Sequence, residues 1–157
     1  MSSIILNSII ILIILIPMAY FFLGGKNKSK EISNLKTLAN QKNLSPEKTG
    51  QWQAGVIGLD KKQNKLCYLN NTDGTNLNII DISEIVKCNV SKQYHKEQVH
   101  EKDISMLKKV SLHFKLKHNS EITIPVYDAD LHPNPGSDLF EAIEWEKIIN
   151  NQISGAK

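Results

Sequence analysis

The chain has 157 residues, a hydrophobic content of 41% and a formal net charge of +3 at pH 7. All of its positive side chains are lysines, because the sequence contains no arginine, and every charged side chain lies at or after Lys26. Arginine carries the planar fork that pairs most specifically with phosphate and guanine. Its absence argues against a nucleic-acid-binding protein and against a site that grips phosphate tightly.

The N-terminal segment from Ile4 to Leu23 is apolar and carries no charge. Its 20 residues correspond to about 30 Å of α-helix, which is the thickness of the hydrocarbon core of a bilayer. Pro17 interrupts the run, but a single proline is tolerated in a membrane helix. The sequence therefore predicts a transmembrane anchor within residues 1–25.

A cleaved signal peptide is the alternative for this segment. Such a peptide needs a basic stretch before its apolar run and a small-residue cleavage site after it. Residues 1–3 carry no basic side chain, and the flank at residues 24–26 fits an uncleaved anchor better. Because Lys26, Lys28 and Lys30 follow the anchor closely, the positive-inside rule places the N-terminus outside and the remaining chain in the cytoplasm.

A short connector and a helix are predicted next. The connector is residues 26–31, and the stretch from Gly24 to Lys30, if fully extended, would keep the following domain within about 25 Å of the bilayer. Ile32, Leu35 and Ala39 then recur at helical spacing, which predicts a helix of about three turns that ends near Asn43.

After Trp52 the sequence consists of short apolar runs separated by turn-forming residues, which is typical of an antiparallel sheet. Pro125 indicates an edge strand or a bulge. The charged segment 92–103 is expected to form a long loop or the tip of a protruding hairpin. Six strands are predicted, at residues 54–59, 65–69, 77–82, 85–90, 107–116 and 121–127.

A final amphipathic helix is predicted after the capping residues Ser137 and Asp138. A broad apolar stripe on this helix must pack against the preceding sheet. Its members are Leu139, Ile143, Ile149 and Ile153, widened by Phe140, Trp145 and Ile148.

Curved antiparallel strands followed by one C-terminal amphipathic helix resemble the pleckstrin-homology-like (PH-like) superfold. The stretches Val56–Asp60, Lys65–Leu69 and Ile82–Val90 are similar to bacterial PH-like domains, including small membrane-anchored ones of unknown function. The resemblance implies an α+β domain at residues 32–153, with a tail at 154–157. The domain would be an antiparallel β-barrel or sandwich of about six or seven strands capped by the helix, and the anchor would lie in a bacterial inner membrane.

The resemblance also implies a candidate lipid site. In lipid-binding PH domains, the loop between the first two strands carries lysines and arginines that grip an inositol phosphate. The matching loop here offers Lys61, Lys62 and Lys65 but no arginine, so a solvated hairpin is the alternative. The connector lysines Lys26, Lys28 and Lys30 would join these three as lipid-facing residues.

The two cysteines lie in separate apolar stretches, at Cys67 and Cys88. Buried free thiols are expected in a reducing cytosol, and pairing across neighbouring strands is the alternative in an oxidising compartment. Trp52 and Trp145 each adjoin an apolar pattern and are expected in the core or at an interface, not in a ligand cage.

Two polar clusters suggest further chemistry. His95 and His100 share the charged segment with Glu97, so a weak metal site is conceivable there, but the spacing matches no metal motif. Asp128 and His132 belong to a second cluster before the final helix, where solvated loop residues are the alternative to an acid-base group. No catalytic, cofactor-binding or metal-ligating residue is predicted.

Three functions remain to be compared. The leading hypothesis is a non-enzymatic binding or scaffolding module at the inner membrane face, which engages an unidentified protein partner through its sheet edge or charged segment. The alternative is a domain that binds anionic lipid through Lys61, Lys62 and Lys65. An enzyme is not expected, because no catalytic motif occurs in the sequence.

Overall fold

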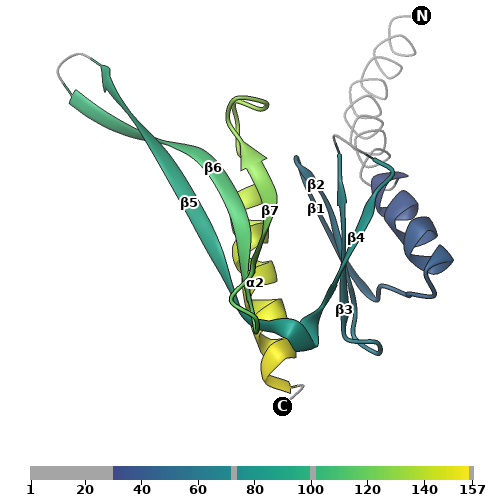
Figure 1. The fold of residues 1–157 in the computed structure, drawn as a ribbon. Helices are drawn as coiled ribbons and strands as arrows, with labels where there is room; N and C mark the ends of the chain where they lie inside the picture. Colours follow the sequence, from purple (N-terminus) through teal and green to yellow (C-terminus); the bar gives the residue numbers. More distant parts are fainter. Residues whose placement is uncertain (1–29, 72–73, 100–101, 156–157) are drawn as a thin grey trace, which may run out of the picture.

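The computed structural model describes residues 30–71, 74–99 and 102–155 (Figure 1). The predicted anchor from Ile4 to Leu23, together with Lys26 and Lys28, lies outside the described residues. Within the described ranges, no helix combines the length and hydropathy that crossing a membrane requires.

The leading helix occupies residues 30–41 and confirms the helix predicted from the apolar spacing. Two residues after its last helical residue, Asn43 has a φ of 59°, in the left-handed region of backbone conformation. The N–H of Leu44 and the N–H of Asn43 donate to the carbonyls of Ala39 (2.9 Å) and Asn40 (3.0 Å), so the end of the helix is a Schellman motif. Leu44 and Ala39 pack together with Cys67, which fixes the helix against the sheet that follows.

The first sheet is an antiparallel meander in the order β1-β2-β3-β4. β2 is buried along its whole length, because Val56 faces the leading helix while Ile57 and Leu59 face the main core. One strand of this sheet was not predicted, since β1 has few apolar residues. The strands are β1 (Lys48–Trp52), β2 (Gly55–Asp60), β3 (Lys65–Asn70) and β4 (Leu77–Asp81).

The second sheet contains three antiparallel strands in the order β5-β6-β7. They are β5 (Ile85–Val99), β6 (Lys102–Leu116) and β7 (Glu121–Asp128), and the 3-10 turn η1 (Ile82–Glu84) joins the two sheets. The charged segment 92–103 belongs to a β5–β6 hairpin that projects beyond β7 (Figure 1), so the long-loop alternative for it is wrong.

The C-terminal helix α2 (Asp138–Gly155) packs against the second sheet and β1. The predicted stripe is only partly correct. Ala142, Trp145, Ile149 and Ile153 are buried, whereas Phe140 is 67% exposed. The rotation of α2 is set by a close approach at Gly50, where an added Cβ would lie 2.1 Å from Nε1 of Trp145.

The two sheets form a sandwich and not a closed barrel, so the barrel expectation is corrected. Pro125 in the edge strand β7 has no N–H to donate, and the β6–β7 register shifts beside it, between Val110 and Ser111. Both the edge and the bulge indicated by this proline are therefore confirmed. The carbonyl of Pro125 instead accepts hydrogen bonds from Nε1 of Trp52 (3.0 Å) and the hydroxyl of Tyr68 (3.3 Å).

Asn150 of α2 covers part of the outer edge of β5. Its side-chain oxygen accepts from the N–H of Cys88 at 3.0 Å, and its side-chain nitrogen donates to the carbonyl of Cys88 at 2.9 Å. The amide thus reproduces the two bonds that a neighbouring strand would make. This contact fixes the position of α2 along the length of β5.

Replacing Asn150 with Ala should destabilise the domain by about 1–3 kcal/mol, because two partly buried backbone groups lose their partners. Urea unfolding of residues 26–157 measures the change. Asn151→Ala is the matched control, since Asn151 is exposed, and it should stay within about 0.5 kcal/mol of the wild type. Equal losses of unfolding free energy in Asn150→Ala and Asn151→Ala would show that the Asn150–Cys88 contact does not stabilise the domain.

Candidate functional site

Of the three loop lysines that the resemblance marked for lipid binding, Lys61 and Lys62 lie in the turn between β2 and β3, and Lys65 is the first residue of β3. Because β1 precedes β2, this turn does not join the first two strands of the sheet. Lys61 and Lys62 are exposed, whereas Lys65 forms an ion pair with Asp81. The structure therefore does not bring the three lysines together as free cations.

The same turn lies at the far end of the domain from residue 30. The side chain of Gln63 donates to the carbonyl of Asn43 at 2.5 Å, beyond the last turn of the leading helix. The helix of residues 30–41 is about 18 Å long. Lys30, at its first turn, is consequently separated from Lys61 and Lys62 by roughly the height of the sheet.

The Lys65–Asp81 pair connects β3 to the start of η1. The hydrogen bond from Lys65 is the largest influence on the Asp81 carboxyl, followed by the hydroxyl of Ser83, and together they lower its pKa from 3.8 to about 2. Asp81 also caps η1 by accepting from the N–H of Ser83 at 3.0 Å. Lys65 therefore supports the connection between the sheets.

The lowered pKa of Asp81 predicts an acid-dependent loss of stability. The charged carboxylate contributes fully above its unfolded pKa of 3.8, and this contribution is lost as the pH falls toward 2. Between about pH 4 and pH 2, urea midpoints should fall more steeply for the wild type than for Asp81→Asn. Urea midpoints that fall equally with pH in the wild type and in Asp81→Asn would contradict this role of Asp81.

Of the remaining polar candidates, His100 lies outside the described residues, so only the second cluster, Asp128, Asp130 and His132, can be placed as a whole. Among the residues that the structure describes, no group of three or more His, Cys, Asp or Glu side chains is placed to hold a metal ion. Asp128 organises a tight turn, because its side chain accepts from the N–H of Asp130 at 3.0 Å and its carbonyl accepts from the N–H of His132 at 3.0 Å. Trp52 and Trp145 are each 2% exposed and confirm the core interpretation.

Both cysteines are free and buried, which confirms the free-thiol expectation. They belong to different packing clusters, since Cys67 packs beneath the leading helix while Cys88 lies in the main core. Burial raises the pKa of Cys67 to about 11 and that of Cys88 to about 12. Neither thiol is placed or activated as a nucleophile.

Iodoacetamide at about pH 8 should leave both thiols unmodified in the folded protein and alkylate both in urea. The physical reason is that burial blocks access and disfavours the thiolate in the folded state. Intact-mass spectrometry counts the adducts. An adduct formed under native conditions would contradict the burial of that cysteine.

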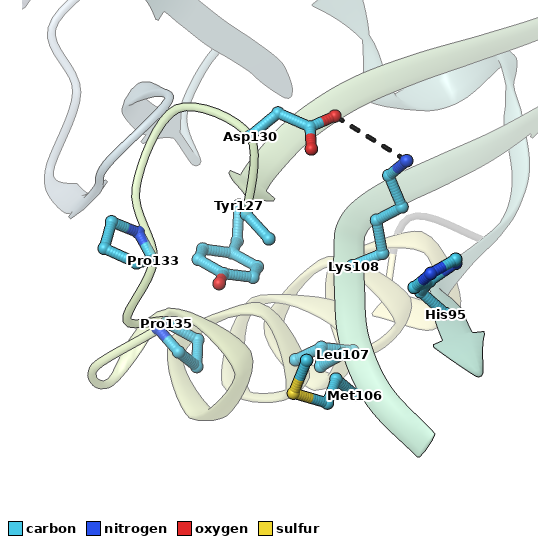
Figure 2. A pocket seen from close by; sticks show the side chains of 9 residues that line it. His95, Met106, Leu107, Lys108, Tyr127, Asp130, Pro133 and Pro135 are labelled. Carbon is cyan, nitrogen blue, oxygen red and sulfur yellow. Dashed lines mark ion pairs between the residues drawn. The ribbon is translucent and has the colours of Figure 1, made fainter. Parts of the chain in front are cut away.

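The second sheet and the loop before α2 enclose a cavity of about 510 Å³. Figure 2 shows Tyr127, from the end of β7, facing Pro133 and Pro135 on one side and Met106 and Leu107 of β6 on the other. The ring of Tyr127 is 2% exposed and forms part of the apolar wall. The volume and mixed lining fall within the range of ligand-binding sites, which is about 300–1,000 Å³.

Charged groups occupy the rim of this cavity. Nζ of Lys108 lies 3.7 Å from a carboxylate oxygen of Asp130, as the dashed line in Figure 2 marks. Lys108 and Asp130 are both well exposed, so this long pair contributes little and leaves Lys108 accessible to a ligand.

Behind the rim, Lys109 and Asp128 form a closer pair, with Nζ and Oδ2 2.7 Å apart. Their hydrogen bond raises the pKa of Lys109 and lowers that of Asp128, so both stay charged. This pair connects β6 to the end of β7 and holds the cavity wall in place.

Sequence reasoning did not identify this cavity. Tyr127 was interpreted only as the end of a strand, and His95 only as part of a charged segment in which a weak metal site was considered. Two features could have drawn attention to the region: the adjacent Pro133 and Pro135, which stiffen the loop, and the apolar residues next to the charged segment.

Comparisons with protein-family models, with curated proteins and with solved structures find no match for this chain. The function must therefore be argued from the residues and geometry of the chain itself.

Proposed function

We propose that this chain is a membrane-anchored, non-enzymatic binding module with a PH-like fold, which holds a protein partner at the inner face of a bacterial membrane. The order of the elements supports the PH-like assignment: four strands come first, three strands follow, and a helix ends the domain. The apolar segment from Ile4 to Leu23 and the lysines that follow it support an N-out anchor with the domain in the cytoplasm.

The cavity beneath the β5–β6 hairpin is the observation on which the proposal depends. Its apolar wall would receive a large apolar side chain of the partner, and its charged rim would orient the surrounding backbone. Tyr94, Ile104 and Met106 of the same hairpin are exposed by 55%, 43% and 50%. Ile104 and Met106 are two residues apart on β6 and share one face of the hairpin, whereas Tyr94, which pairs with Leu107, lies on the other face. Neighbouring exposed apolar side chains on one face, such as Ile104 and Met106 beside the cavity, are typical of a protein-binding surface.

The charge of the hairpin arms indicates the chemistry of the partner. The two strands of the hairpin, Ile85–Val99 and Lys102–Leu116, contain seven lysines against one glutamate, Glu97, and one aspartate, Asp103. Lys108 is paired with Asp130 of the loop that follows β7, and Lys109 is paired with Asp128 at the end of β7. The other five leave the arms positive, so the bound segment would combine an apolar side chain with acidic neighbours.

Binding of anionic lipid through Lys61, Lys62 and Lys65 is the second proposal. The exposure of Lys61 and Lys62 supports it. The ion pair of Lys65 with Asp81 and the distance of the turn from residue 30 weigh against it.

Photo-crosslinking in cells tests the first proposal. Benzoylphenylalanine at position 106 of the full chain should form adducts with a protein, because Met106 lines the cavity and is 50% exposed. Position 86 is the matched control, since Val86 is 51% exposed but lies at the other end of β5. Adducts with lipid only, or equal protein adducts from both positions, would contradict the proposal.

The rim charge provides a second control within the same experiment. Lys108→Glu should lower the adduct yield at position 106 by about two- to fivefold, since an exposed charge pair contributes roughly 0.5–1 kcal/mol. Lys115→Glu carries the same charge change on an exposed residue outside the cavity and should leave the yield unchanged.

A further inference from the structure

The exposed apolar residues of the domain concentrate at one end. Seven large hydrophobic side chains are exposed in the described part of the chain, and five of them come from the projecting half of the β5–β6 hairpin, the loop after β7 and the first turn of α2. The other two are Ile79 of β4 and Val86 at the start of β5. In Figure 1 the hairpin tip and the loop after β7 lie at the upper end, and α2 begins below that loop. Leu131 and Phe140 are the most exposed of all, at 65% and 67%.

The leading helix begins at this same end. The side chain of Gln51 in β1 donates to the carboxylate of Glu31, in the first turn of that helix. The side chain of Gln53 donates to the carbonyl of Asn134 in the loop after β7, at 2.7 Å. Glu31, Gln53 and His132 consequently line one cavity, next to Leu131 in the chain.

The length of chain before the described residues limits how far this end can be from the bilayer. Six residues, 24–29, separate the apolar segment ending at Leu23 from the start of the helix. Fully extended, they span at most about 20 Å. If Ile4 to Leu23 cross the membrane, the end that carries Leu131 and Phe140 is the end nearest to the lipid.

Leu131 is presented by a rigid turn. Its N–H donates to the carbonyl of Asp128 at 3.1 Å, and the next N–H, that of His132, donates to the same carbonyl. Polar residues are usual at the tip of a solvated turn, because exposing the apolar surface of a leucine to water is unfavourable. A leucine held outward by two hydrogen bonds is in contrast well suited to an apolar environment.

The charges around Leu131 and Phe140 do not oppose contact with lipid. Asp128 and Asp130 are paired with Lys109 and Lys108. Asp138 is 6% exposed and accepts from the N–H of Gln53 at 3.1 Å. Asp128 and Asp138 are thus paired or buried, whereas Asp130 is 66% exposed and Glu141 directly follows Phe140. These two carboxylates would stay in the headgroup layer while Leu131 and Phe140 make the apolar contact, since leucine and phenylalanine both partition into the bilayer interface.

From these observations we infer that the domain docks on the bilayer through Leu131 and Phe140, which places the lysine turn at Lys61 and Lys62 on the side away from the lipid. This inference rests on the membrane anchoring in the proposed function. It is independent of the partner cavity, because neither Leu131 nor Phe140 lines it. The occupant is a lipid surface, and it would contact the pair without needing anionic headgroups.

The test uses the full chain in phosphatidylcholine nanodiscs that contain a spin-labelled quencher lipid. Single cysteines at Leu131→Cys and Phe140→Cys carry a fluorophore, while the buried Cys67 and Cys88 should stay unlabelled. Both labels should be quenched roughly twofold. Labels at Lys61→Cys and at Val86→Cys, an exposed apolar position outside this end, should not be quenched.

Salt and lipid charge separate apolar docking from lysine-driven docking. Raising salt from about 0.1 M to 1 M shortens the screening length from about 10 Å to 3 Å, which should leave quenching at positions 131 and 140 unchanged. Quenching at position 61 instead of 131 and 140, or quenching that appears only with anionic lipid, would overturn the inference in favour of the lysine turn.

Two further outcomes would also overturn it. Absence of quenching at all positions in a chain that is incorporated into the discs would show that the domain stands away from the lipid. Failure of the full chain to enter the discs would remove the anchor itself, and the proposed function would fail with it.

Discussion

The contact between Trp145 of α2 and Gly50 of β1 determines how the C-terminal helix is rotated. Any side chain at position 50 would overlap the indole, since an added Cβ would lie 2.1 Å from its Nε1. Positions five residues away on a helix are turned by about 140°. Phe140 lies five residues before Trp145 and Asn150 lies five residues after it. With the indole fixed against Gly50, Phe140 therefore points toward solvent and Asn150 points toward the backbone of β5.

Most strands were predictable because alternation of apolar and polar residues survives in them. Val110, Leu112 and Phe114 of β6 show this directly, and all three are buried. β1 was missed because its sequence, Lys-Thr-Gly-Gln-Trp, places a glycine where an apolar side chain would be expected. The glycine is required by Trp145, which is 95 positions later in the chain, and no local pattern carries that information.

The candidate site was less predictable than the fold. The cavity combines residues of β5, β6, β7 and the loop before α2, which come together only when the three strands pair and the loop folds back beside them. The error over the lysine turn had a simpler origin: without β1, the β2–β3 turn was counted as the first turn of the sheet. The stripe of α2 was misjudged for a related reason, since Phe140 satisfies the apolar spacing but the indole turns it outward.

The amide of Asn150 has a consequence for how this protein avoids association with itself. β5 is an edge strand of 15 residues, and a long open edge invites edge-to-edge pairing and aggregation. An incoming strand would have to displace Asn150 and leave both backbone groups of Cys88 without partners. The side chain of Asn150 therefore prevents another strand from pairing with β5 near Cys88. Any chain that adds to the edge of β5 must pair with its projecting half.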